Sequence, residues 1–166
     1  MTFSIEKAQH DSYSTQINFM DPLKSKIINF AKKYLKDAIK VETEPHCTIL
    51  FGIQDKEVKN KISSTFCSGI LGEIKKFSQP EQDVIYIEVF SSDAHNKHNY
   101  IKDNFKVKLT HPNYTPHVTL GYCKKGSNDN LLTNKTFYGD KFQDVEILFC
   151  GKDEQKYKLS SIIRKL

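Results

Sequence analysis

The sequence predicts an α+β fold in one domain over residues 1–166. Segments with strand preferences and segments with helical periodicity are mixed along the chain, and the helices cluster early and midway. A length of 166 residues with 38% hydrophobic side chains fits one continuous core and leaves no room for a second full-sized domain. An aromatic content of 11% is too high for a disordered chain. We therefore expect a globular protein.

Segments rich in β-branched and aromatic residues and bounded by turn residues are the expected strands. They lie at residues 12–20, 45–53, 70–77, 84–90, 116–123, 144–150 and 157–162. The polar turn at 78–83 joins two of them into a hairpin.

Apolar residues at helical spacing predict three helices, at residues 22–35, 55–68 and 94–105. Asp21 has the residue type of an N-cap for the first helix, and Pro22 suits its first position. Ser92 followed by Asp93 provides the expected start of the third helix.

The formal net charge is +5, and its cationic side is almost wholly lysine, because Arg164 is the only arginine. A mild positive field favours phosphate-bearing partners. Forked arginine readout of guanine is nearly absent from this composition, which argues against sequence-specific binding of duplex DNA.

The four cysteines lie far apart, and no C-x-x-C pair suggests a zinc knuckle or a redox motif. Their even number would fit two disulfides in a secreted protein, but the N-terminus lacks the basic and apolar regions of a signal peptide. No run reaches the roughly 18 apolar residues of a membrane span. We therefore expect a cytoplasmic protein without membrane contact, in which the cysteines pack as small apolar side chains.

One pattern occurs twice: proline, histidine, any residue, threonine and an aliphatic residue, at 45–49 and at 116–120. Because side chains alternate along a strand, His46 and Thr48 share one face, and so do His117 and Thr119. The two histidines are 71 positions apart, which leaves space between them for a helix, a hairpin and another helix. This arrangement indicates an internal duplication in which each half contributes one such strand to a shared central groove.

Two histidines that face each other across a groove suit phosphodiester cleavage without a metal. One imidazole takes a proton from the attacking oxygen while the other protonates the leaving oxygen, and histidine serves in either state near neutral pH. The hydroxyls of Thr48 and Thr119 would bind non-bridging phosphate oxygens. The sequence thus predicts His46 and His117 as an acid and base pair, without showing which of them is the acid.

These motifs resemble those of the two-histidine (2H) phosphoesterases, LigT-like and cyclic-nucleotide-phosphodiesterase-like proteins defined by two H-x-[T/S]-x motifs. Here they read His-Cys-Thr-Ile at 46–49 and His-Val-Thr-Leu at 117–120, and the similarity in spacing and element order covers roughly residues 13–166. The resemblance implies a bilobal α+β fold with pseudo-two-fold symmetry, in which antiparallel sheets line a central groove and helices lie outside. It also implies a metal-independent phosphodiesterase that uses no cofactor and acts on phosphodiesters bearing a neighbouring ribose hydroxyl.

The longer strings, Pro-His-Cys-Thr-Ile-Leu-Phe-Gly and Thr-Pro-His-Val-Thr-Leu-Gly-Tyr, are similar to the bacteriophage branch with its anti-CBASS nucleases, which degrade cyclic oligonucleotide signals of bacterial immunity. The expected substrate is an RNA-like phosphodiester. It is either a cyclic oligonucleotide attacked through its own 2′-hydroxyl or an RNA 2′,3′-cyclic phosphate end. A viral protein of this kind would act in the host cytoplasm. The rival is a module that binds or sequesters nucleotides in the same groove without cleaving them, against which the presence of both histidines and both threonines argues.

A metal site is the other interpretation of the histidines, because imidazole is a common metal ligand. It would need a third ligand on the same face, and strand alternation points Cys47 away from His46. His95 and His98 have the spacing of half a metal site on the expected third helix, but they lie among Asn and Lys residues on what reads as a solvated face. We therefore expect no metal.

Gly121 follows the second motif, and simple alternation would place it on the face of His117 and Thr119. There it would provide clearance for a ribose or a base of the substrate. Six aromatic residues are candidates for a base-stacking platform, and the sequence does not select among them: Tyr13, Phe19, Tyr86, Phe90, Tyr114 and Tyr122.

Overall fold

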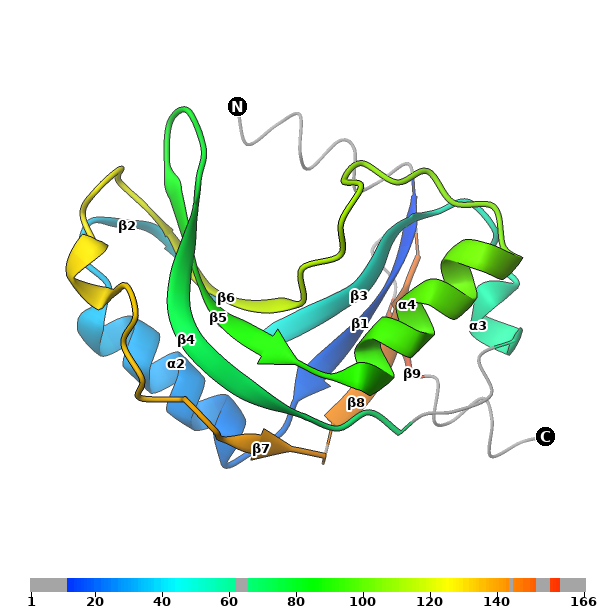
Figure 1. The fold of residues 1–166 in the computed structure, drawn as a ribbon, viewed down its shortest axis with the longest axis horizontal. Helices are drawn as coiled ribbons and strands as arrows, with labels where there is room; N and C mark the ends of the chain where they lie inside the picture. Colours follow the sequence, from blue (N-terminus) through cyan, green and yellow to red (C-terminus); the bar gives the residue numbers. More distant parts are fainter. Residues whose placement is uncertain (1–11, 62–65, 144, 152–155, 159–166) are drawn as a thin grey trace.

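The described residues form two antiparallel sheets that curve into a half-barrel (Figure 1). The computed structural model describes residues 12–61, 66–143, 145–151 and 156–158. The first sheet has the strand order β3-β1-β8-β9. Its strands are β3 (His46–Ile53), β1 (Tyr13–Phe19), β8 (Val145–Cys150) and β9 (Lys156–Lys158).

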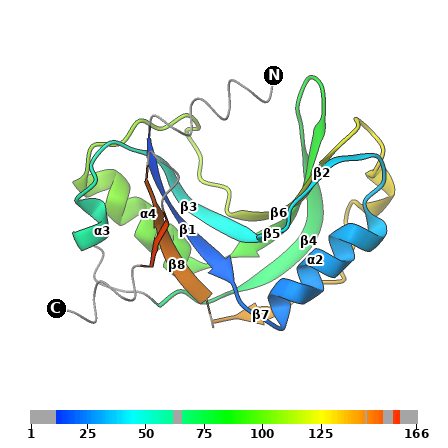
Figure 2. The same cartoon turned by 180° about the vertical axis from the view of Figure 1, so that it is seen from behind.

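The second sheet has the order β2-β6-β5-β4-β7. Its strands are β2 (Ala38–Val41), β6 (His117–Cys123), β5 (Asp83–Phe90), β4 (Gly69–Ser78) and β7 (Lys141–Phe142). The helices are α2 (Leu23–Tyr34), α3 (Val58–Lys61) and α4 (Ser92–Asn104), with a short 3-10 turn at Asp129–Leu131. Seen from both sides, α2 and α4 lie on the outer side of the half-barrel (Figures 1 and 2).

A strand–helix–strand unit occurs twice, as β1–α2–β3 and as β5–α4–β6, with β2 placed between the helix and the last strand of the first unit. In each unit the last strand begins with the motif histidine and pairs antiparallel with the first strand. A third strand, β8 in one half and β4 in the other, pairs with the far side of the first strand. This arrangement confirms the pseudo-two-fold symmetry that the resemblance of the motifs implies.

The first motif strand carries a β-bulge directly after its threonine. In β3, Thr48 pairs with Gln16, whereas Leu50, two residues later, pairs with Thr15, which is adjacent to Gln16 in β1. The intervening Ile49 is therefore the extra residue of the bulge, and it reverses the alternation of the side chains beyond it.

The second motif strand carries the same bulge at the equivalent position. In β6, Thr119 pairs with Tyr86 and Gly121 with Ile85, so that Leu120 is the extra residue. Both strands are half-buried at their first, third and sixth residues and buried at the others up to the seventh. The sixth residue of each strand thus returns to the face that carries the histidine and the threonine.

Each of the two long helices packs on the motif strand of the other half. The contacts join α4 to β3 and α2 to β6. The outer faces of both strands lie in one continuous core whose largest fully buried side chains come from both halves, among them Phe19, Ile49, Leu50, Ile85, Phe137 and Phe149. Since the halves interlock in this way, the outer packing gives the inner faces of β3 and β6 a common rigid support.

The sequence prediction of a helix over residues 55–68 is wrong in its extent. Among the described residues the helix α3 covers Val58–Lys61, and residues 55–57 and 66–68 are not helical; residues 62–65 lie outside the described part of the chain. Cys67 is fully buried, and both the backbone N–H and the hydroxyl of Ser68 donate to the carboxylate of Asp93, at 2.9 and 3.1 Å. These tertiary contacts fix a non-helical connection to β4, which local periodicity does not report.

The other expected strands and helices are found within about two residues of their predicted bounds, a usual uncertainty for such assignments. Asp144 and residues 159–162 of the last two expected strands lie outside the described part of the chain. The strands β2 and β7 were not expected, because both are short and β2 is mostly exposed. The four cysteines form no disulfide with one another; Cys47, Cys67 and Cys123 are buried in the core, as expected, whereas Cys150 is half-buried. None of the helices in the described ranges is long and apolar enough to cross a membrane.

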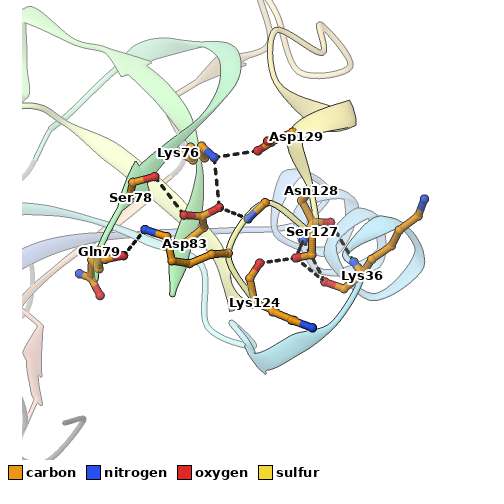
Figure 3. A network of polar contacts seen from close by, with 11 residues as sticks. Lys36, Lys76, Ser78, Gln79, Asp83, Lys124, Ser127, Asn128 and Asp129 are labelled. Atoms are coloured by element: carbon orange, nitrogen blue, oxygen red, sulfur yellow. Dashed lines mark hydrogen bonds and ion pairs between the residues drawn. The ribbon is translucent and has the colours of Figure 1, made fainter. Parts of the chain in front are cut away.

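A buried carboxylate braces the hairpin of β4 and β5, which rises above the rest of the second sheet in Figure 1. Asp83 is 1% exposed and accepts hydrogen bonds from the backbone N–H of Gly126 at 2.8 Å, from Lys76 at 3.2 Å and from Ser78 at 3.1 Å (Figure 3). The Gly126 amide, followed by the Lys76 and Ser78 side chains, holds the pKa of this carboxyl below its usual range, against the effect of burial. The loop after β6 and the hairpin are thus tied together at one point.

We expect Asp83→Ala to lower the free energy of unfolding by about 1–3 kcal/mol, because buried donors lose a charged acceptor. Urea denaturation measures the change. Asp129→Ala is the matched control: Asp129 is an exposed partner of Lys76, and its removal should cost only about 0–1 kcal/mol. Equal losses in the two variants would contradict a special role for Asp83.

Candidate active site

The two motif histidines are anchored in the same way. His46 Nδ1 lies 2.9 Å from the backbone carbonyl oxygen of Glu44, and His117 Nδ1 lies 2.7 Å from that of Thr115. A carbonyl oxygen only accepts, so each Nδ1 carries a hydrogen and donates it. When the ring is neutral, Nε2 is therefore the free basic nitrogen; when the ring is protonated, Nε2–H is the free acid. In both imidazoles, Nε2 is thus the nitrogen that can exchange a proton.

Thr48 and Thr119 follow their histidines on the inner face of β3 and β6, where both are half-buried. The two motifs lie close together at the junction of the two sheets. The charge of His46 is one of the causes that lower the pKa of His117, and Cys47, behind His46, lies against the backbone amide of His117. The structure thus brings the four candidate catalytic residues onto one inner surface.

The imidazole of His117 has an apolar wall that the sequence does not reveal. It contacts Phe77 and Tyr86 edge to face, with ring centroids 5.0 and 5.3 Å away, and these two rings stack on each other at 4.1 Å. Burial is the main cause that lowers the pKa of His117; the carbonyl of Thr115 opposes the shift, and the charge of His46 adds to it. His117 is therefore biased toward the neutral form that acts as a base.

Polar side chains stand next to both motifs on the neighbouring strands. On the first sheet, Asn18 pairs with His46 on one side and with Glu146 on the other. Cross-strand partners share a face, so these side chains border the first motif. Gln16 lies beside Asn18 on this surface and donates to its side-chain oxygen at 2.6 Å. Alternation within the strand at 12–20 groups Gln16 with Asn18, but only the register of the sheet shows that they adjoin His46.

The second sheet adds a charged pair. Glu88 is the cross-strand partner of His117, and Lys75 is that of Tyr86, which in turn pairs with Thr119. Lys75 Nζ lies 3.2 Å from the carboxylate of Glu88. An ammonium group and a carboxylate therefore lie on the inner face close to the second motif.

The β-bulges decide which other residues join the inner face. Phe51 and Tyr122, the sixth residues of β3 and β6, are half-buried there at equivalent positions of the two halves. The placement of Gly121 on this face was wrong, because the bulge at Leu120 turns it to the opposite side. A Cβ atom on Gly121 would lie 2.7 Å from a methyl carbon of Leu35 and 2.7 Å from the carbonyl oxygen of Lys40. This glycine allows close packing of β6 against β2 and the end of α2.

The two histidines of α4, His95 and His98, pack against the ring of Tyr114. His98 Nδ1 lies 2.7 Å from the carbonyl oxygen of Ile49, and its ring stacks on Tyr114 at 4.1 Å. His95 contacts the same tyrosine ring edge to face at 5.0 Å. Within the part of the chain that the structure describes, no three His, Cys, Asp or Glu side chains gather as a metal site would require.

A family model matches most of the chain. It is that of "Anti-CBASS protein Acb1", and it matches residues 12–147. The chain belongs to this anti-CBASS family. No curated protein sequence matches it closely enough to count as a relative.

Solved structures share the fold. The structure of Kluyveromyces marxianus Usb1 with uridine monophosphate superposes with a TM-score of 0.61 at 9% identity, over 91% of this chain and 99% of that one. A second structure of K. marxianus Usb1 gives 0.61 at 10% identity, over 90% of this chain and 97% of that one. Family and fold together confirm the 2H phosphoesterase architecture, and the chain is a phosphodiesterase.

Phe77→Ala should raise the pKa of His117 toward its ordinary value of about 6.5, because removal of the ring admits water to the imidazole. Titration of the histidine signals by NMR measures this pKa. Phe77→Leu, which keeps an apolar cover, is the matched control and should leave the pKa near that of the wild type. If the pKa of His117 is the same in all three proteins, burial against Phe77 is not its cause.

Proposed function

We propose that this protein is a metal-independent nuclease that opens cyclic oligonucleotides at their phosphodiester bonds. The observation that carries the proposal is the pair of His-x-Thr strands related by the pseudo-two-fold axis, with both imidazoles anchored through Nδ1. In this arrangement two Nε2 atoms and two hydroxyl groups are available to one phosphate. Membership in the anti-CBASS family supports a cyclic oligonucleotide as the substrate, and RNA 2′,3′-cyclic phosphate ends are the second substrate class with the same chemistry.

The reaction begins with attack of a ribose 2′-hydroxyl on the adjacent phosphorus. His117, whose pKa is lowered by burial, takes the proton of this hydroxyl at Nε2. The bond from phosphorus to the 5′-oxygen breaks, and protonated His46 donates its Nε2 proton to that oxygen. The products are a 5′-hydroxyl and a 2′,3′-cyclic phosphate. In hydrolysis of the cyclic phosphate the two histidines exchange roles, because a water then has to be deprotonated and the 2′-oxygen protonated.

Thr48 and Thr119 would hold the phosphate during both steps. Their hydroxyls are on the same face as the imidazoles and can donate to the non-bridging oxygens, where charge increases in the transition state. Lysines, which provide nearly all of the cationic charge, would help to attract a small polyanion.

His46→Ala and His117→Ala should each reduce turnover by about 10²–10⁴-fold, the usual contribution of a general acid or base. Suitable substrates are a panel of cyclic di- and trinucleotides, RNA with a 2′,3′-cyclic phosphate end and tRNA fragments, with products separated by chromatography. His111→Ala, an exposed histidine in the loop before β6, is the matched control and should keep full activity.

Treatment of the wild type with EDTA should leave this turnover intact. Loss of activity in EDTA that zinc restores would replace the proposal with a metallohydrolase. Binding of a nucleotide by the wild type with no turnover across the panel would instead indicate a sequestering module.

The pH dependence of kcat/KM should reflect the lowered pKa of His117. A general base works only when it is unprotonated, so activity falls as the pH drops through this pKa. Because that pKa lies below the ordinary value of about 6.5, the acidic limb of the profile should also lie below about pH 6.5. A limb clearly above this pH would contradict the assignment of His117 as the base in ring opening.

A further inference from the structure

At the first motif, the outer edge of β3 is held by side chains, and backbone pairing with the segment around Val107 begins only at the far end of the strand, at Gly52 and Ile53. In the sheet order β3 is the terminal strand of the first sheet. The hydroxyl of Tyr114 donates to the carbonyl oxygen of Thr48 at 2.8 Å, and His98 Nδ1 donates to that of Ile49 at 2.7 Å. These two carbonyls belong to the motif threonine and to the bulge residue that follows it.

The two donors support each other. The rings of His98 and Tyr114 stack at 4.1 Å with an angle of 3° between their planes, and His95 contacts the tyrosine edge to face. Burial raises the pKa of the Tyr114 hydroxyl and is the main cause that lowers the pKa of His98. Tyr114 therefore keeps its proton as a donor, and His98 packs as a neutral ring that donates through Nδ1.

In the other half of the molecule, the carbonyl of the bulge residue is bound by a backbone N–H instead of by a side chain. The bulge residue of the second motif, Leu120, offers its carbonyl oxygen to the backbone N–H of Glu42 at 2.9 Å, directly after β2. The pseudo-symmetric position in the first motif is Ile49, whose carbonyl accepts from His98. In the first half, His98 and Tyr114 thus take the place that β2 and the residue after it occupy in the second half.

Tyr114 also connects the first motif to the second along the chain. It lies three residues before His117 and directly before Thr115, whose carbonyl anchors the His117 ring. Burial raises the pKa of the Cys47 thiol to about 12, and the His117 backbone amide and the Tyr114 hydroxyl beside the thiol oppose this rise. One side chain therefore contacts the first motif strand while its own backbone leads into the second.

We propose that Tyr114, with its ring held by His98, is a positioning residue that fixes the separation and orientation of the two His-x-Thr motifs. The hydroxyl of Tyr114 does not take part in the chemistry, because it is bonded to a backbone carbonyl behind the motif. The inference rests on the proposed function, since it assigns the geometry in which His46 and His117 share one phosphate. A small displacement of one imidazole relative to the other would slow the proton transfers while leaving most substrate contacts in place.

Tyr114→Phe tests this inference, because it removes one hydroxyl group and keeps the ring stack. We expect kcat to fall by about 10- to 100-fold, while KM stays within about twofold. Tyr100→Phe on α4, at a tyrosine that is 45% exposed, is the matched control with wild-type kcat. His98→Phe keeps a stacking ring without the donor and should reduce kcat in the same direction.

A second measurement does not depend on turnover. Burial and the charge of His46 both lower the pKa of His117, and both weaken if the two motifs separate. The pKa of His117, measured by NMR, should therefore rise toward about 6.5 in Tyr114→Phe but not in Tyr100→Phe. The melting temperature should fall by only about 2–4 °C, so that every variant is folded at the assay temperature.

The inference is overturned if Tyr114→Phe keeps the wild-type kcat, or if it leaves the pKa of His117 unchanged. A loss of melting temperature alone would mean that the tyrosine is merely structural. If the wild type shows no turnover on the substrate panel, the proposed function fails, and the pKa comparison by itself then decides whether Tyr114 positions the two motifs.

Discussion

The β-bulge after each motif threonine is the constraint on which the inner surface depends. A regular strand would alternate through the whole motif and would bring Leu50 and Gly121 to the face of the histidines. The extra residue reverses this pattern, so that Phe51 and Tyr122 lie there instead. The second residues of the two strands, Cys47 and Val118, lie between the histidine and the threonine and remain in the core. The chain can thus present a polar group at the first and third positions and an aromatic ring at the sixth without exposing its apolar side.

The bulge has a cost, because it leaves backbone carbonyls without their partners in the ladder. The two halves meet this requirement differently: the second uses the backbone next to β2, and the first uses side chains from α4 and from the segment before β6. The two motif strands are therefore related by symmetry, but the groups that bind their bulge carbonyls are not. The helices add to this connection, since α2 and α4 each pack on the motif strand of the opposite half.

A second asymmetry concerns the environment of the imidazoles. Both rings are anchored by a carbonyl two residues earlier, but His117 also packs against Phe77 and Tyr86. Desolvation by these rings disfavours the charged imidazole. In the proposed mechanism both histidines carry protons, and their unequal packing favours His117 as the base. This difference comes from β4 and β5, which lie far from the motifs in the sequence.

Local sequence patterns are enough to predict the fold class, most of the strands, two of the three expected helices and the shared strand faces of the motif histidines and threonines. Each of these follows from local rules: alternation, helical periodicity and the chemistry of histidine and threonine at a spacing of two. Strand register and tertiary contacts were needed to show that Gly121 faces α2, that residues 66–68 are not helical, and that Asn18, Glu88 and Phe77 border the histidines. These features depend on strand register, on a bulge and on contacts between distant segments. Such contacts leave no periodic signal in the chain, because the two partners that make them are not neighbours in sequence.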